Sequence, residues 1–108
     1  MLRLIALLLM LPIMSIAGEA VPVPLSKAQI AQIKSTVAKD FLDPGSAQFR
    51  NIRAVDWTRS SGKVVRRVCG EVNGKNAFGG YVGFSMFGGR MENGRFRQVD
   101  FFGPCEKR

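Results

Sequence analysis

The N-terminal segment constrains the fold most, because it decides how much chain is left to build a core. Arg3 precedes an apolar run over residues 4–16, and small residues follow it up to Ala20. This is the layout of a secretory signal peptide. The alternative is a membrane anchor, but the run is shorter than the roughly 20 apolar residues of a spanning helix, and Pro12 interrupts it. The sequence therefore predicts a cleaved leader, residues 1–20, with one domain over residues 21–108 in the periplasm or outside the cell.

Export decides how the two cysteines, Cys69 and Cys105, are interpreted. In an oxidising compartment they predict one disulfide, which the chain-entropy treatment values at roughly 3.5–4 kcal/mol. A mature chain of about 88 residues has a small core, so this contribution matters. A metal site is not expected, because the sequence has no histidine and no third thiol. No cofactor is expected either.

The chain is basic, with a formal net charge of +8 that loss of the leader leaves unchanged. This charge favours an anionic partner such as a lipid surface, a nucleic acid or an acidic protein. Six arginines fall in segments with strand character, and they would form a patch if they shared one face: Arg50, Arg53, Arg66, Arg67, Arg95 and Arg97. The alternative is a solvated exterior that keeps an exported protein soluble.

One helix is expected near the start of the mature chain. The residues before it, 21–24, contain two prolines and predict an extended, polyproline-like lead-in. Ser26 and Gln29 have the spacing of a capping box, and Asp43-Pro44 predicts the end of the helix. The apolar residues recur at helical spacing in a narrow stripe: Ile30, Ile33, Val37 and Phe41. A narrow stripe favours packing on a sheet over binding to a membrane surface.

Beyond the helix the apolar pattern changes to period two, which is typical of strands. The predicted strands are 49–58, 63–72, 80–87 and 95–102. The first hairpin is expected to place Asp56 within reach of Arg66 or Arg67. Asn73-Gly74 and Asn93-Gly94 are strong hairpin-turn dipeptides.

The third strand is expected to present Val82, Phe84 and Met86 on one face, and Gly88-Gly89 is expected to break or bulge it. The sequence therefore predicts an α+β fold. In this fold an N-terminal helix packs on a four-stranded antiparallel sheet that one disulfide, Cys69–Cys105, closes.

The glycine-rich segment 69–87 does not fit the known phosphate-binding motifs. Three residues separate Gly70 from Gly74-Lys75 where a phosphate loop has four, and Asn76 follows where Ser or Thr is needed. The glycines also open a strand instead of a helix, which excludes the dinucleotide fingerprint. With no histidine, a nucleophilic serine would need a lysine base, and Ser60 alone has one three residues later, in a segment expected to turn between two strands. The sequence predicts no catalytic residue.

The same segment holds polar side chains between flexible glycines, an arrangement typical of a recognition loop. The candidate binding residues are Asn73, Lys75, Asn76 and Tyr81, together with Arg66, Arg67, Arg95 and Arg97. The alternative is an ordinary polar surface loop with the usual turn residues.

Three blocks of the sequence, DPGSAQFR (43–50), CGEVNGKN (69–76) and GGYVGF (79–84), resemble a group of small exported bacterial and phage proteins. Those proteins generally carry no described function. The resemblance implies an exported bacterial module with one helix and a small sheet, and it implies no catalytic residue.

These observations together predict an exported, non-catalytic binding module for an anionic or protein partner. Trp57 and the phenylalanines could instead stack on bases beside the arginines, so the alternative is a protein that binds nucleic acid or a membrane surface. A periplasmic enzyme inhibitor or a hydrolase is the third class considered.

Overall fold

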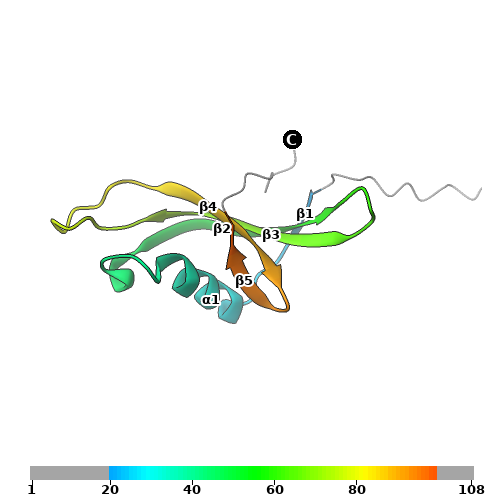
Figure 1. The fold of residues 1–108 in the computed structure, drawn as a ribbon, viewed down its shortest axis with the longest axis horizontal. Coiled ribbons are helices and arrows are strands. Elements are labelled where there is room, and N and C mark those ends of the chain that lie inside the picture. Colours follow the sequence, from blue (N-terminus) through cyan, green and yellow to red (C-terminus); the bar gives the residue numbers. More distant parts are fainter. Residues whose placement is uncertain (1–19, 100–108) are drawn as a thin grey trace, which may run out of the picture.

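A computed structural model of the chain describes residues 20–99, which form one antiparallel sheet with a helix on one face (Figure 1). The strands follow one another across the sheet in chain order, from β1 at one edge to β5 at the other. The elements are β1 (Ala20–Val23), α1 (Lys27–Ala38), a 3-10 turn (Pro44–Ser46), β2 (Gln48–Thr58), β3 (Val64–Asn73), β4 (Ser85–Glu92) and β5 (Arg95–Gln98).

The sheet has five strands, so the expectation of four was wrong. The additional strand is β1, in which Ala20 pairs with Trp57 and Val23 with Ala54. A four-residue segment with a proline shows no period in the sequence, but an edge strand tolerates that proline because one of its sides needs no donor. The predicted leader overlaps β1 at Ala20.

No cysteine among the described residues is free, and the predicted disulfide depends on a residue outside them. Cys69 is buried on β3, where it pairs in register with Arg53 of β2 and Gly88 of β4. Cys105 lies outside the described residues.

Helix α1 begins as predicted, but it ends five residues before Asp43. The Ser26 Oγ accepts a hydrogen bond from the Gln29 N–H at 3.1 Å, and the Gln29 side chain accepts one from the Ser26 N–H at 2.8 Å. At the other end the Phe41 N–H donates to the Ala38 carbonyl, which closes a tighter turn. The Phe41 ring then packs against Gly74, so a tertiary contact outweighs the helical spacing of Phe41.

A bulge in β2 allows Phe49 and Ile52, which are separated by an odd number of positions, to face the core together. The register with β3 shifts between Arg50 and Arg53, and Asn51 has a positive φ of 55°. Phe49 and Ile52 both pack against the core as a result, although they are three positions apart.

Strand β4 starts at Ser85, not at residue 80, so the predicted bounds of this strand were wrong. Gly79 and Gly83 have positive φ angles, which interrupt the extended backbone before Ser85. Val82 and Met86 are 69% and 70% exposed, whereas Phe87 is buried. Residues 88 and 89 continue the strand and do not break it.

The core lies between α1 and the sheet. Its buried residues are Ile33, Val37, Ala54, Val68, Val72, Phe87 and Phe96. The Phe87 ring meets the rings of Phe49 and Phe96 edge to face, with centroids 6.0 and 6.3 Å apart. A Cβ on Gly70 would come within 2.5 Å of the Phe87 ring, and one on Gly89 within 2.6 Å of the Phe96 ring. The two strand glycines therefore make room for the aromatic core.

Strand β5 ends at Gln98, and the part of the predicted strand from residue 100 lies outside the described residues. The Asn93-Gly94 turn that leads into it is confirmed, with φ angles of 52° and 78°. The outer edge of β5 is covered by a side chain of α1. The Gln32 amide accepts from the Phe96 N–H at 2.7 Å and donates to its carbonyl at 3.5 Å. This amide takes the place of a neighbouring strand.

Candidate functional site

The predicted arginine patch divides between the two faces of the sheet. Neighbouring residues of a strand point to opposite faces. Val68 and Phe96 lie in the core between the sheet and α1. Arg66 is two positions from Val68 and therefore points to the helix side. Arg67, Arg95 and Arg97 are direct neighbours of these core residues and point to the opposite face. We call the face opposite α1 the arginine face.

On the helix side, Arg66 is paired with Asp56, as the sequence predicted. The Arg66 Nε and Nη2 donate to the two Asp56 oxygens at 2.8 and 3.1 Å. This hydrogen-bonded pair raises the pKa of Arg66 above its ordinary value. The charge of Arg66 is thus balanced within the β2–β3 hairpin.

On the arginine face, Arg67 lies flat on an aromatic ring. Its guanidinium carbon is 3.8 Å from the centre of the Trp57 ring. Burial lowers the pKa of Arg67, and repulsion from Arg59 lowers it further. The stacking holds this guanidinium in one orientation beside β4.

Three arginines stand side by side across three strands of this face. Arg67 of β3 is opposite Arg90 of β4, and Arg90 is opposite Arg97 of β5. We call Arg67, Arg90 and Arg97 the arginine row. Like charges directly opposite each other destabilise a sheet.

The Glu92 carboxylate forms ion pairs with two members of the row, Arg90 and Arg97. The Glu92 oxygens lie 2.5 Å from the Arg90 Nε and 3.4 Å from the Arg97 Nη1. Arg95 is opposite Glu92 in register and is exposed. The side chain of Arg97 is 68% exposed. The corner formed by β4 and β5 therefore presents more positive than negative charge to solvent.

Arg90 was not among the predicted site residues. The predicted third strand ends at residue 87, which leaves Arg90 outside any strand. Continuing the alternation through Gly88-Gly89 would have placed Arg90 and Met86 on the same face, opposite Phe87. That alternation was the available signal.

A second cluster on the arginine face lies near the bulge of β2. The Glu71 Oε2 accepts hydrogen bonds from the Arg50 Nε at 3.0 Å and from the Asn51 Nδ2 at 2.7 Å. These hydrogen bonds hold the pKa of Glu71 below its ordinary value, and the bond from Arg50 has the largest effect. The Arg50 guanidinium carbon also lies 3.8 Å from the centre of the Phe84 ring.

The predicted recognition loop forms an arm, residues 74–84, that joins β3 to β4. In Figure 1 the arm projects at the end of the sheet opposite the β2–β3 turn. The predicted turn at Asn73-Gly74 is not where the chain reverses. Hydrogen bonds between Asn76 and Gly80 close the turn further out, and Lys75 forms a bridge with Tyr81.

The polar groups of the loop largely bond within the protein. The buried Asn73 accepts from the Gly83 N–H at 2.9 Å, and its amide donates to the Gln48 side chain at 3.5 Å. The Tyr81 hydroxyl donates to the Ser46 carbonyl at 2.9 Å. The Lys75 ammonium lies 5.3 Å from the centre of the Tyr81 ring. These contacts hold the arm in shape, and the role of these residues in binding stays a prediction.

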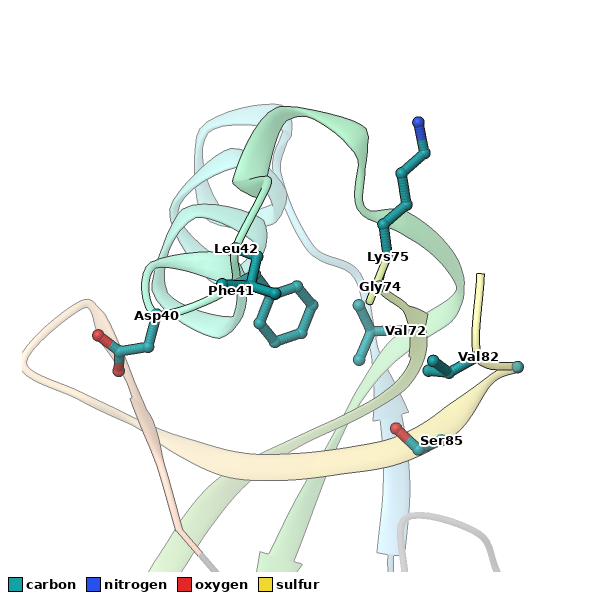
Figure 2. Close-up of a pocket in the computed structure, with 9 residues that line it drawn as sticks. Asp40, Phe41, Leu42, Val72, Gly74, Lys75, Val82 and Ser85 are labelled. Carbon is teal, nitrogen blue, oxygen red and sulfur yellow. The ribbon is translucent and has the colours of Figure 1, made fainter. Parts of the chain in front are cut away.

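A pocket of about 320 Å³ lies where the arm leaves the sheet. Figure 2 shows Phe41 and Leu42 on the helix side of this pocket and Val72, Val82 and Ser85 on the sheet side. Asp40 and Lys75 also line it and carry opposite charges. Apolar and polar atoms line its interior in nearly equal measure.

Within residues 20–99, no group of three or more His, Cys, Asp or Glu side chains is arranged to hold a metal ion. Helix α1 has 12 residues, and no helix in the described part of the chain is long and apolar enough to cross a membrane.

Comparison of the chain with protein-family models, with curated proteins and with solved structures finds no match. The resemblance to small exported bacterial and phage proteins stays a prediction.

Proposed function

We propose that this protein is an exported, non-catalytic binding module that holds an acidic protein partner on the corner of the arginine face formed by β4 and β5. The observation that carries the proposal is the register of Arg67, Arg90 and Arg97 across three neighbouring strands. A guanidinium presents a planar fork of donors that matches a carboxylate. A row of three suits a partner with several carboxylates on one surface.

The immediate surroundings of the row support an anionic partner. Glu92 is shared between Arg90 and Arg97, so two positive charges face one negative charge. Arg95 adds a further exposed cation beside them. An incoming carboxylate beside Arg90, Arg95 and Arg97 would form charge-assisted contacts with this excess of positive charge.

The aromatic rings favour an acidic protein over a single-stranded nucleic acid. Proteins that bind single strands without sequence preference stack bases on exposed aromatic faces. On the arginine face, the Arg67 guanidinium lies over the Trp57 ring and the Arg50 guanidinium lies over the Phe84 ring. Arginine therefore takes the place that a base would need.

The test measures binding of the chain, expressed from its complete sequence, to a glutamate-rich peptide by isothermal titration calorimetry. The double variant Arg90→Gln/Arg97→Gln is expected to weaken binding at least about tenfold, because two charge-assisted contacts are lost. The control is Lys27→Gln/Lys39→Gln, which removes the same charge from two exposed residues at the ends of α1. It is expected to change the affinity less than about twofold, as general attraction alone is reduced.

Equal losses in the two double variants would overturn the proposed site, because affinity would then follow net charge alone. The same titrations use a single-stranded oligonucleotide and vesicles that contain phosphatidylglycerol. Tighter, arginine-row-dependent binding to either of these probes than to the peptide would overturn the assignment of an acidic protein as the partner.

A further inference from the structure

The arm carries an exposed aromatic side chain at its tip. Phe78 is 96% exposed, which is unusual for a large apolar residue. Three further exposed apolar residues lie on the arm or beside it: Leu42, Tyr81 and Val82. Several exposed apolar side chains at one end of a molecule are typical of a site of interaction with another molecule.

The arm holds Phe78 in a defined position. The Asn76 Oδ1 accepts hydrogen bonds from the Phe78 N–H at 3.0 Å and from the Gly80 N–H at 3.1 Å. The Asn76 N–H in turn donates to the Gly80 carbonyl at 2.8 Å. A loop ordered before binding loses less conformational entropy in a complex. The tip is therefore suited to act as an anchor.

The pocket at the base of the arm fits one apolar side chain. Its volume of about 320 Å³ lies at the lower end of the range for ligand pockets. Phe41 and Val72 form apolar walls, and Leu42 and Val82 lie at its exposed border (Figure 2). One aromatic ring in the pocket would cover the exposed side chains of Leu42 and Val82.

We propose that two copies of this chain form a two-fold symmetric dimer in which Phe78 of each copy enters the pocket of the other. Both the anchor and the pocket belong to one end of the molecule. A two-fold axis beside the arm therefore allows both insertions at once, and such a contact closes on itself without forming a filament.

The charges around the pocket suit a second copy. Asp40 lies on the helix side of the pocket and Lys75 on the arm side. A two-fold rotation can bring Asp40 of one copy beside Lys75 of the other, which favours contact between two such surfaces. The arginine row lies on β3, β4 and β5 outside this pocket, so the proposed dimer leaves it available to the acidic partner. One arm and one pocket per copy make a small interface, which is typical of weak association.

Sedimentation velocity at increasing concentration tests the proposal on the chain expressed from its complete sequence. The unaltered protein is expected to shift from monomer to dimer between micromolar and millimolar concentration. Phe78→Ala removes the anchor, and Val82→Glu places a charge at the border of the pocket. Each is expected to keep the protein monomeric over that range. Both residues are exposed, so neither change removes a core contact.

The control is Val64→Ala, which trims an exposed apolar residue at the start of β3 and is expected to leave the dimer intact. Isotope-filtered NMR on a mixed labelled sample is expected to show contacts between the Phe78 ring of one copy and Val82 methyl groups of the other. A monomer at all concentrations would overturn the proposal, as would a dimer that persists in Phe78→Ala or lacks these contacts. Binding to the glutamate-rich peptide is expected to survive in Phe78→Ala, which separates this proposal from the proposed function.

Discussion

The helix side of the sheet and the arginine face are built from alternate residues of the same strands, yet they differ in kind. On the helix side, Phe87 and Phe96 lie against Gly70 and Gly89, and space is filled so closely that no Cβ fits there. On the arginine face, Arg90 and its neighbours are long, charged and partly in solvent. The first face stabilises the fold, and the second leaves charges for a partner.

This difference shows where substitutions are tolerated. In a packed core the loss or gain of one group is felt by every neighbour. Exposed charged side chains such as Arg97 have alternative conformations and solvent as a substitute partner, so single changes there have small effects on stability. The following predictions test that contrast, from the largest expected effect to the smallest.

Phe87→Ala is expected to have the largest effect, because it removes the ring between Phe49 and Phe96 and leaves a cavity. The expected loss is about 3–5 kcal/mol in the free energy of unfolding. Urea denaturation followed by circular dichroism measures it. The control is the adjacent Met86→Ala on the arginine face, which is expected to change stability by less than about 0.5 kcal/mol. Similar losses in the two variants would refute the contrast.

Gly89→Ala adds a single methyl group, and its carbon would lie within 2.6 Å of the Phe96 ring. Because the ring or the strand must move, we expect a loss of about 1–3 kcal/mol in the free energy of unfolding. Gly45→Ala is the matched control, since a Cβ there meets nothing within 4 Å. Equal stability of Gly89→Ala and the unaltered protein would show that this face is packed less tightly than the structure indicates.

Gln32→Ala uncovers the outer edge of β5 at Phe96, where the Gln32 amide bonds both backbone groups. A net loss of about 1 kcal/mol is expected in the free energy of unfolding, as for a typical hydrogen bond. Hydrogen exchange of the Phe96 amide should also become faster. Ser35→Ala, an exposed change on the same helix, is the control. Unchanged exchange at Phe96 would mean that the amide does not protect this edge.

Glu71→Gln is expected to have the smallest effect, and one that depends on pH. The pKa of Glu71 in the folded protein is below its ordinary value of 4.5, first through the bond from Arg50. The contribution of this carboxylate is therefore present above pH 4.5 and is lost as the pH falls through the folded-state pKa. The melting temperature of the unaltered protein should fall more between pH 7 and about pH 3 than that of Glu71→Gln.

Asp43→Asn is the control for Glu71→Gln, because it removes a carboxylate from an exposed position before the 3-10 turn. The melting temperature of Asp43→Asn should fall between pH 7 and about pH 3 by as much as that of the unaltered protein. Identical acid sensitivity in Glu71→Gln and the unaltered protein would remove this cluster from the account of the arginine face.

Prediction from the sequence succeeded where the signal was local. The capping box at Ser26, the β2–β3 hairpin and the pairing of Asp56 with Arg66 are confirmed. It failed at β1 and at β4. Strand β1 has only four residues, which is too short to show an alternation of apolar and polar side chains. In β4 the glycines have no side chain, so the alternation is interrupted in the sequence. The error in the bounds of β4 also left Arg90 outside any predicted strand.

By itself, the sequence determined the positive charge, the start of the helix and the turn at Asn93-Gly94, because each depends on residues close together in the chain. The tertiary structure alone decided which residues of β4 face α1 and which stand beside Arg67. The physical reason is that a strand has a side-chain period of two, so pairing with its neighbour selects one of two opposite faces. In the glycine-rich β4, side chains of other elements decide which face is buried, as the Phe96 ring of β5 does where it packs against Gly89.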